Sequence, residues 1–448
     1  MILDEANFRL ETCKSCHPLF GDPQNIMDAP GLWAVAPTAP GVFNHLNFDD
    51  TVNCTVCHTG VGSAAASLEQ LHTGYNPLIY TDALDGTQIG DEISVSIDAA
   101  SFADNTLHVE FSASGTSTAG GVDLDATDIV PTVLVGLYGR DTKDYLIGPH
   151  ARDIDGDRNL EFAVVGSAGG TDWTTDFPRA TVDPSSTPGN WIVDVDLSAF
   201  SYLIGADNDI TKAEIGIMPD LDVALDAVSE SFDLVGNNFI APVADIVRVE
   251  TGCNNCHDAL NTTFHLSSGV PRGRGGSIEV CRLCHISLSG GSNIEMQSRS
   301  IDSYVHAIHS FQSFNYGDVD FEDPVEALHY EHHIGFVYPT LGFDCESCHN
   351  PGTYDVPKQT GSMPGLLSAS DSNDTIDRNI GDVPEYVTGP AVRACGACHR
   401  TQRINSDDAA GLTTLNQHFE DYGYLWENDE NDVILHYIID IVFSVFAP

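Results

Sequence analysis

The segment 253–309 organises the chain and reads CNNCHDALNTTFHLSSGVPRGRGGSIEVCRLCHISLSGGSNIEMQSRSIDSYVHAIH. It contains the pattern C-x-x-C-H twice, at 253–257 and at 281–285. This pattern is the attachment site of a c-type haem. The two thiols add to the two vinyl groups of the haem, and the imidazole that follows becomes the proximal ligand of the iron. The segment therefore predicts two covalently bound haems.

The same pattern occurs six times in the chain and uses all twelve cysteines. The attachment cysteines are Cys13, Cys16, Cys54, Cys57, Cys253, Cys256, Cys281, Cys284, Cys345, Cys348, Cys395 and Cys398, and the proximal ligands are His17, His58, His257, His285, His349 and His399. A zinc framework would need paired half-sites at set spacings, whereas the gaps between these motifs are irregular. A disulfide framework would not require a histidine after every second cysteine. The sequence therefore predicts six haem c groups.

Each iron also needs a distal ligand, and the chain has histidines outside the motifs to supply one. We assign these positions to His45, His72, His265, His306, His309 and His418. Two of them, His306 and His309, are three residues apart and would share one face of a helix. His332 or His333 could take the place of His418 or His72, and in a polymer one distal histidine could come from a neighbouring subunit. We expect six bis-histidine irons with low potentials.

The charge of the chain is strongly negative, with 66 acidic against 18 basic residues and a formal net charge of −48. Nucleic acids and anionic membranes are therefore poor partners, because both are polyanions. Such a surface suits a saline or extracellular setting, where salt screens the repulsion. Haem attachment follows export, so we expect an extracellular or outer-surface protein. The first residues lack a signal-peptide pattern, which favours removal of a signal. The apolar end 433–448 is too short for a membrane span.

The region 81–247 has no cysteine and is expected to form an antiparallel β-domain. Short runs of alternating apolar and polar residues occur at 92–98, 107–112, 132–138, 160–165, 191–197 and 213–218, with turn residues between them. This pattern is typical of a β-sandwich or barrel. His108 alternates within one run and is interpreted as a structural residue. The turn 153–159 places oxygen donors at every second position, which makes calcium a candidate ligand there. An ordinary acidic turn is the competing interpretation.

The chain is thus predicted to be multidomain, with haem-packed modules, largely irregular or helical, flanking the β-domain. The expected divisions are a dihaem module at 1–80, the β-domain at 81–247 and a tetrahaem module at 248–448. The apolar end 433–448 is rich in β-branched residues. It could pair as an added strand with a neighbouring subunit or lie on its own domain. We interpret the β-domain as a spacer or docking module.

Several further sequence motifs lie in the predicted tetrahaem region. They are His265 eight positions after His257, the run VHAIH at 305–309, Tyr-Pro ahead of Cys345, CESCHNPGTYDVP at 345–357 and PAVRACGACH at 390–399. On these residues the chain resembles the outer-surface decahaem cytochromes of metal-reducing bacteria, the OmcA/MtrC family, over roughly residues 85–420. The resemblance implies a β-domain ahead of a haem module. It also implies exposed haems that pass electrons to minerals, shuttles or partner cytochromes.

The chain departs from that family in two ways. A family haem module has five haems, and here the fifth motif is missing after His418. The family also begins with a β-domain, whereas this chain begins with a dihaem module. An early haem pair in a hexahaem chain is similar in layout to extracellular cytochromes that polymerise into filaments. That second likeness concerns haem count and layout alone.

The prediction for function is an electron-transfer protein, not an enzyme. It would conduct electrons outside the cell through bis-histidine haems to external acceptors or partner cytochromes, as a monomer or as a polymerised filament. The alternative is a multihaem reductase with one open haem site. All six motifs end in histidine, which favours capped irons, and the negative charge would repel oxyanion substrates.

Overall fold

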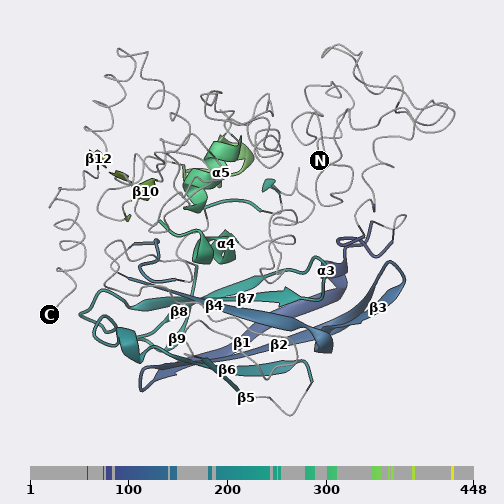
Figure 1. Cartoon of the computed structure of the whole chain (residues 1–448), viewed down its shortest axis with the longest axis horizontal. Coiled ribbons are helices and arrows are strands. Elements are labelled where there is room, and N and C mark those ends of the chain that lie inside the picture. The colour runs from purple at the N-terminus through teal and green to yellow at the C-terminus, as the bar shows by residue number, and fades with distance from the viewer. Residues whose placement is uncertain are drawn as a thin grey trace, which may run out of the picture.

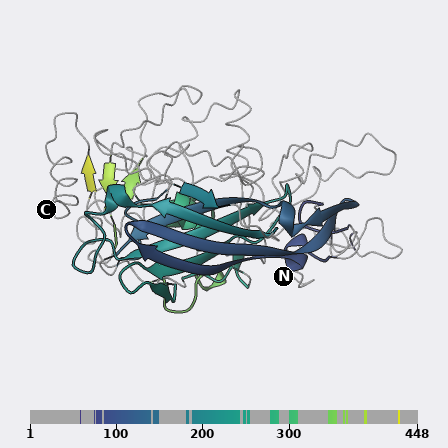
Figure 2. The ribbon, with the colours of Figure 1, turned by 90° about the horizontal axis from the view of Figure 1, so that it is seen from below.

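The computed structural model describes part of the chain, and most of that part is the β-domain. The described residues are 58, 74, 77–82, 86–139, 142–148, 180–183, 188–242, 246–249, 251–253, 278–287, 300–309, 345–354, 362–363, 365–367, 386–388 and 425–427. Two antiparallel sheets account for most of the regular structure (Figures 1 and 2).

The first sheet has the strand order β1-β2-β6-β5, and β3 pairs with the far end of β2. Its strands are β1 (Ile93–Ala103), β2 (Thr106–Ala119), β3 (Val122–Asp125), β5 (Ala180–Asp183) and β6 (Asn190–Asp196). The second sheet has the order β4-β7-β8-β9, with β4 (Val130–Tyr138), β7 (Lys212–Asp220), β8 (Val228–Asp233) and β9 (Asn238–Ile240). Every pairing in both sheets is antiparallel. Short helical turns lie beside the strands: α3 (Ile89–Glu92), η4 (Ala126–Asp128) and η5 (Ser198–Phe200).

Two-residue turns set the register of the long hairpins. Asp104 and Asn105 connect β1 to β2 with positive φ angles of 52° and 61°. Gly120 and Gly121 connect β2 to β3, again with positive φ at both positions. Two consecutive residues with positive φ match the twist of the flanking strands, which is why Asp, Asn and Gly are favoured there. These turns align the apolar residues of β1, β2 and β3 on fixed faces.

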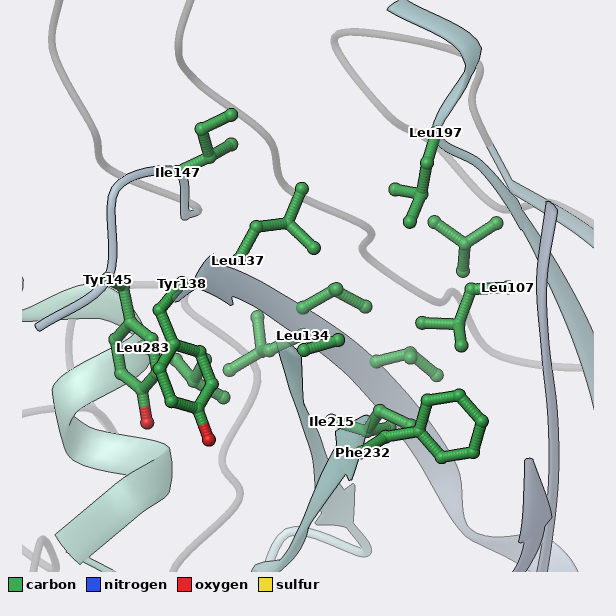
Figure 3. Packing of buried hydrophobic residues seen from close by; sticks show 14 of the residues in the cluster. Leu107, Leu134, Leu137, Tyr138, Tyr145, Ile147, Leu197, Ile215, Phe232 and Leu283 are labelled. Carbon is green, nitrogen blue, oxygen red and sulfur yellow. The ribbon is translucent and has the colours of Figure 1, made fainter. Parts of the chain in front are cut away.

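The core lies between the two sheets. The first sheet contributes alternate residues of β2 and β6, and the second contributes alternate residues of β4 and β7; they include Leu107, Val109, Phe111, Val193, Val195, Val133, Val135, Leu137, Ala213, Ile215 and Ile217, all almost fully buried. Part of this packing is seen in Figure 3. Each fully buried aliphatic side chain contributes roughly 1.5–3 kcal/mol. Because the described strands form two separate sheets, the β-domain is a sandwich and not a closed barrel.

The strands predicted at 92–98, 107–112, 132–138, 191–197 and 213–218 are confirmed as β1, β2, β4, β6 and β7. The short strands β3, β5, β8 and β9 were not predicted, because runs of three to six residues carry little alternation. The run 160–165 and the acidic turn 153–159 lie outside the described residues. His108 lies on β2, where its Nδ1 is 2.7 Å from Asp194 Oδ1 and its Nε2 is 3.2 Å from Glu110 Oε1.

The described elements after the β-domain are few and short. They are α4 (Ile278–Cys284), α5 (Ile301–His309) and the turn η9 (Cys345–Ser347). A small sheet of order β10-β11-β12 joins β10 (Gly365–Leu367), β11 (Tyr386–Thr388) and β12 (Leu425–Glu427). The expectation of irregular or helical structure did not include this sheet. Among the described helices, none combines the length and the apolar character that a membrane crossing needs.

Candidate haem-binding site

The haem motif 281–285 lies mostly on helix α4, which packs on the outer face of the second sheet, against β4 and β7 (Figure 1). Leu283 of this motif is completely buried, beside Tyr138 and Tyr145 (Figure 3). Gly136 and Gly216 make room for it on neighbouring strands. A Cβ atom added at either glycine would lie 2.6 Å from a Leu283 methyl carbon. Leu283 of the motif helix therefore occupies a depression in the sheet where Gly136 and Gly216 have no side chain, which we call the glycine notch.

Arg282, the other variable residue of the motif, binds the loop that follows β4. Its guanidinium donates a hydrogen bond to the carbonyl oxygen of Lys143. It also lies 3.9 Å from Asp144 Oδ1 and 5.0 Å from the ring centre of Tyr145. Burial alone would lower the pKa of Arg282, but the fields of Tyr145 and Asp144 outweigh it, so the side chain stays charged. Arg282 and Leu283 together attach the motif to the sandwich.

The motif 345–349 pairs with the segment that leaves the sandwich. The backbone N–H of Arg248 donates to the carbonyl of Cys348 over 2.7 Å, and that of Asn350 donates to the carbonyl of Ile246 over 2.9 Å. Val247 forms an antiparallel bridge with His349. The Thr353 hydroxyl also donates to the Ile246 carbonyl, over 2.8 Å. A second haem motif is thus fixed by the backbone that follows the β-domain.

His306 and His349 face each other. His306 lies on α5, so His306 and His309 are on one helix, and His349 closes the motif 345–349. Their ring centroids are 6.0 Å apart and their planes differ by 29°. The structure therefore brings His306, a predicted distal ligand, and His349, a predicted proximal ligand, together as a stacked pair of rings.

Cysteines from three motifs lie close to one another. Cys253 has its thiol hydrogen-bonded to that of Cys348, and Cys281 is near enough to act on it electrostatically. The contact with Cys348, followed by burial, raises the pKa of the Cys253 thiol well above its usual range. None of Cys253, Cys281, Cys345 and Cys348 forms a disulfide, so their sulfur atoms remain available for thioether bonds to haem. The described parts of motifs 253–257, 281–285 and 345–349 thus converge in one region.

The described residues include only part of the predicted site. His58 is half-buried, and His285 accepts a backbone hydrogen bond from Ile301 over 3.0 Å, which connects α4 to α5. Cys284 and His309 lie on α4 and α5, but their side chains are not described. The remaining predictions lie outside the described residues: Cys13, Cys16, His17, His45, Cys54, Cys57, His72, Cys256, His257, His265, Cys395, Cys398, His399, His418, the reserve ligands His332 and His333, and the apolar end 433–448. No group of three metal-binding side chains is found among the described residues.

Sequence reasoning missed the residues that dock α4 on the sheet. A glycine inside a strand often marks a close approach of another element. Gly136 and Gly216 each interrupt a predicted strand, so this signal was present in the runs TVLVGLY and AEIGIM. Nothing in the sequence showed that the approaching element would be a haem motif. The β-domain is therefore a seat for one haem motif and not simply a spacer.

Comparison with known proteins gives a family match and several structural neighbours, of which two are described here. Residues 245–431 match the family model described as outer membrane cytochrome MtrC/MtrF-like, domains II/IV. The crystal structure of MtrC from Shewanella baltica aligns with a TM-score of 0.38 at 15% identity, over 71% of this chain and 47% of that chain. The crystal structure of the outer membrane decahaem cytochrome OmcA aligns with a TM-score of 0.40 at 16% identity, over 85% of this chain and 50% of that chain.

This chain therefore spans about half the length of the two structures. No curated protein sequence matches it. The family match covers the described parts of motifs 253–257, 281–285 and 345–349, together with both helices α4 and α5. It agrees with the resemblance carried by the VHAIH, CESCHNPGTYDVP and PAVRACGACH runs. The segment 245–431 is thus similar to domains II/IV of the MtrC/MtrF-like outer membrane cytochromes.

Proposed function

We propose that this chain is an extracellular hexahaem c-type cytochrome that conducts electrons through bis-histidine haems. Its electrons would pass to external acceptors or to partner cytochromes. The single observation that carries the proposal is the His306–His349 pair, in which a predicted distal and a predicted proximal ligand lie with their ring centroids 6.0 Å apart. The family match of residues 245–431 supports haem c as the cofactor and the outer cell surface as the location.

In this proposal His349 is the proximal ligand and His306 the distal ligand of the haem attached by Cys345 and Cys348. A bound haem supplies a reversible one-electron couple at its iron. The chain fixes both imidazoles. The backbone of 345–349 is bonded to the segment 246–248, and α5 presents His306 toward His349. An iron capped on both sides has no position for a substrate, which favours electron transfer over catalysis.

The convergence of three motifs supports short steps between haems. The thiols of Cys253 and Cys348 interact directly, and Cys281 lies near them. Haems attached at these cysteines would start from neighbouring points of the chain. The docking of α4 by Arg282 and Leu283 would hold one of these haems against a rigid sandwich. The chain thus contributes fixed positions, and the haems contribute the redox chemistry.

The remaining assignments extend the same scheme to six haems. They include the distal ligands His45, His72, His265, His309 and His418, and the alternatives His332 and His333 for two of them. Polymerisation through the end 433–448 and a calcium ion at 153–159 are additional proposals that rest on sequence pattern alone. Each predicts a separate, measurable property of the purified protein.

The experiment is a ligand deletion on the haem-loaded protein. His306→Ala should leave the mass of the covalently haem-loaded chain, corrected for the substitution, at six haems. It should convert one low-spin ferric haem to high spin in the EPR spectrum. The control is His108→Ala, because His108 is bonded to two carboxylates on the opposite sheet and should leave the spectrum unchanged. A fully low-spin His306→Ala protein would remove His306 from the ligand set, and fewer than six haems in the unmodified protein would overturn the haem count.

A further inference from the structure

Glu214 is a buried carboxyl between the second sheet and the haem-motif helix. It lies on β7 with an exposed fraction of only 1%. The Ser231 hydroxyl donates a 2.5 Å hydrogen bond to its Oε2. Its Oε1 has no hydrogen-bond partner among the described residues. A buried carboxylate with one unpaired oxygen is costly, whereas the protonated acid is tolerated better.

The position of Glu214 follows from the register of β7. Gly216 faces the Leu283 side chain of α4, and residues two apart on a strand share a face. Glu214 therefore faces the same helix. The neighbouring residues Ala213 and Ile215 point the other way, into the core between the sheets. The carboxyl is thus located under the helix that carries Cys281 and Cys284.

Charged and polar groups from each adjacent element lie around the Glu214 carboxyl, between the second sheet and α4. They are Tyr138 on β4, Asp144 and Tyr145 in the following loop, Lys212 on β7 itself, Ser229 and Ser231 on β8, Glu279 and Arg282 on α4, and Asp302 on α5. Burial, with a smaller contribution from the charge of Glu279, raises the pKa of Glu214 to about 7 against the opposing effects of the Ser231 and Ser229 hydroxyls and of Arg282. Burial also raises the pKa of Tyr138 to about 12 and that of Tyr145 well above its usual value, so both remain protonated. Glu214 is therefore a carboxyl that can exchange a proton near neutral pH.

We propose that Glu214 is a proton-binding site coupled to the redox state of the haem attached by Cys281 and Cys284. This inference rests on the proposed function, because it requires a haem on α4. An α-helix is about 10 Å wide, so only one helix separates the carboxyl from the haem side of the motif. The intervening material is buried protein, in which charges interact more strongly than in water.

The coupled step conserves charge. When a partner cytochrome donates one electron, the ferric iron becomes ferrous and the haem loses one positive charge. The Glu214 carboxylate then takes up one proton from solvent and becomes the neutral acid. Reoxidation by an external acceptor removes the electron, and the proton returns to solvent. The Ser231 hydroxyl donates to the carboxylate form and reorients when the acid forms.

The test is a redox titration of the full haem-loaded chain between pH 5.5 and 8.5, combined with redox-induced infrared difference spectroscopy. One haem potential should fall with rising pH, by up to about 59 mV for each tenfold fall in proton concentration. A carboxylic-acid C=O band should appear on reduction and shift in D2O. Both signals should be lost in Glu214→Gln. Glu110→Gln on the opposite sheet is the matched control and should keep both signals.

The outcomes separate this inference from the proposed function. Loss of both signals in Glu214→Gln, with six haems retained, supports the coupling. If the slope and the band survive in Glu214→Gln, the coupling belongs to another group and the inference fails. The infrared measurement on the unmodified protein does not depend on whether the Glu214→Gln variant folds. If the unmodified protein shows no carboxylic-acid band on reduction, the inference is overturned. A peptide containing Cys281 and Cys284 without haem, seen by mass spectrometry, would instead overturn the proposed function.

Discussion

The two outer faces of the β-sandwich carry titratable groups in opposite settings. On the first sheet, His108 lies in a partly exposed position between Asp194 and Glu110. On the second sheet, Glu214 is buried under α4 with one oxygen unpaired. Burial would lower the pKa of His108, but its two carboxylate partners outweigh this effect and raise it. For Glu214 burial itself is the largest cause of the raised pKa.

The difference between the two faces indicates which one contacts a C-x-x-C-H motif. The first sheet has polar residues outward in regular alternation, as expected of a solvated face. The second sheet has glycines, a buried acid and the buried Tyr138 on its outer face. These residues would not be expected on a face exposed to solvent. Their presence is accounted for by helix α4, which covers this face. The second sheet is thus the seat of the motif 281–285.

The largest expected effect comes from removing the side chain that fills the glycine notch. Leu283→Ala should destabilise the domain by about 2–5 kcal/mol, because it leaves a cavity where Leu283 is completely buried. Guanidinium denaturation followed by far-UV circular dichroism measures the change. Val122→Ala, at a residue that is 65% exposed, is the control and should change the stability very little. Equal stability losses in the two variants would mean that α4 is not docked as described.

The next effect is a change in pH dependence on the buried face. The folded pKa of Glu214, about 7, lies above the usual glutamate value of 4.5, so the folded state keeps a proton that the unfolded state loses. Stability of the unmodified protein should therefore fall as pH rises from about 4.5 to about 7. Glu214→Gln should remove this loss, a relative gain of roughly 3 kcal/mol at pH 8 compared with pH 4. Denaturation midpoints across that range measure it, and an unchanged slope in the variant would contradict the burial of this acid.

A smaller effect should follow from filling the notch. Gly216→Ala adds a Cβ that would lie 2.6 Å from a Leu283 methyl carbon, so the Leu283 side chain or the helix must shift. The expected cost is about 1–3 kcal/mol. The double variant Gly216→Ala with Leu283→Ala should cost less than the sum of the two single changes, because the added methyl enters the space that the leucine leaves. Simple additivity of the two changes would argue against this contact.

The smallest effect is expected on the exposed face. The raised pKa of His108 means that its contribution to stability is complete below the unfolded pKa of about 6.5 and is lost as pH rises through the higher folded value. Asp194→Asn removes the strongest partner and should reduce the fall in stability as pH rises above the unfolded pKa of about 6.5, by an amount lessened by solvent screening. Thermal midpoints over that range are the measurement. A slope identical to that of the unmodified protein would show that the pair contributes nothing.

The sequence alone predicted what depends on local pattern. The spacing of the six C-x-x-C-H motifs predicts attachment cysteines and proximal ligands, and alternation located the long strands β1, β2, β4, β6 and β7. The spacing of His306 and His309 predicted a shared face if the segment was helical, and the structure has α5 there. Non-local contacts were not predictable. Pairing of His306 with His349, and of Leu283 with Gly136 and Gly216, depends on segments far apart in the chain.

We propose that every iron is capped by two histidines, and a spin count on the oxidised protein tests this proposal. The oxidised, fully haem-loaded chain is examined by quantitative EPR, with the spin count calibrated against total haem. Six low-spin ferric haems and no high-spin signal are expected. One high-spin haem would contradict the proposal, because that iron would have an open position and the chain would be capable of binding a substrate there.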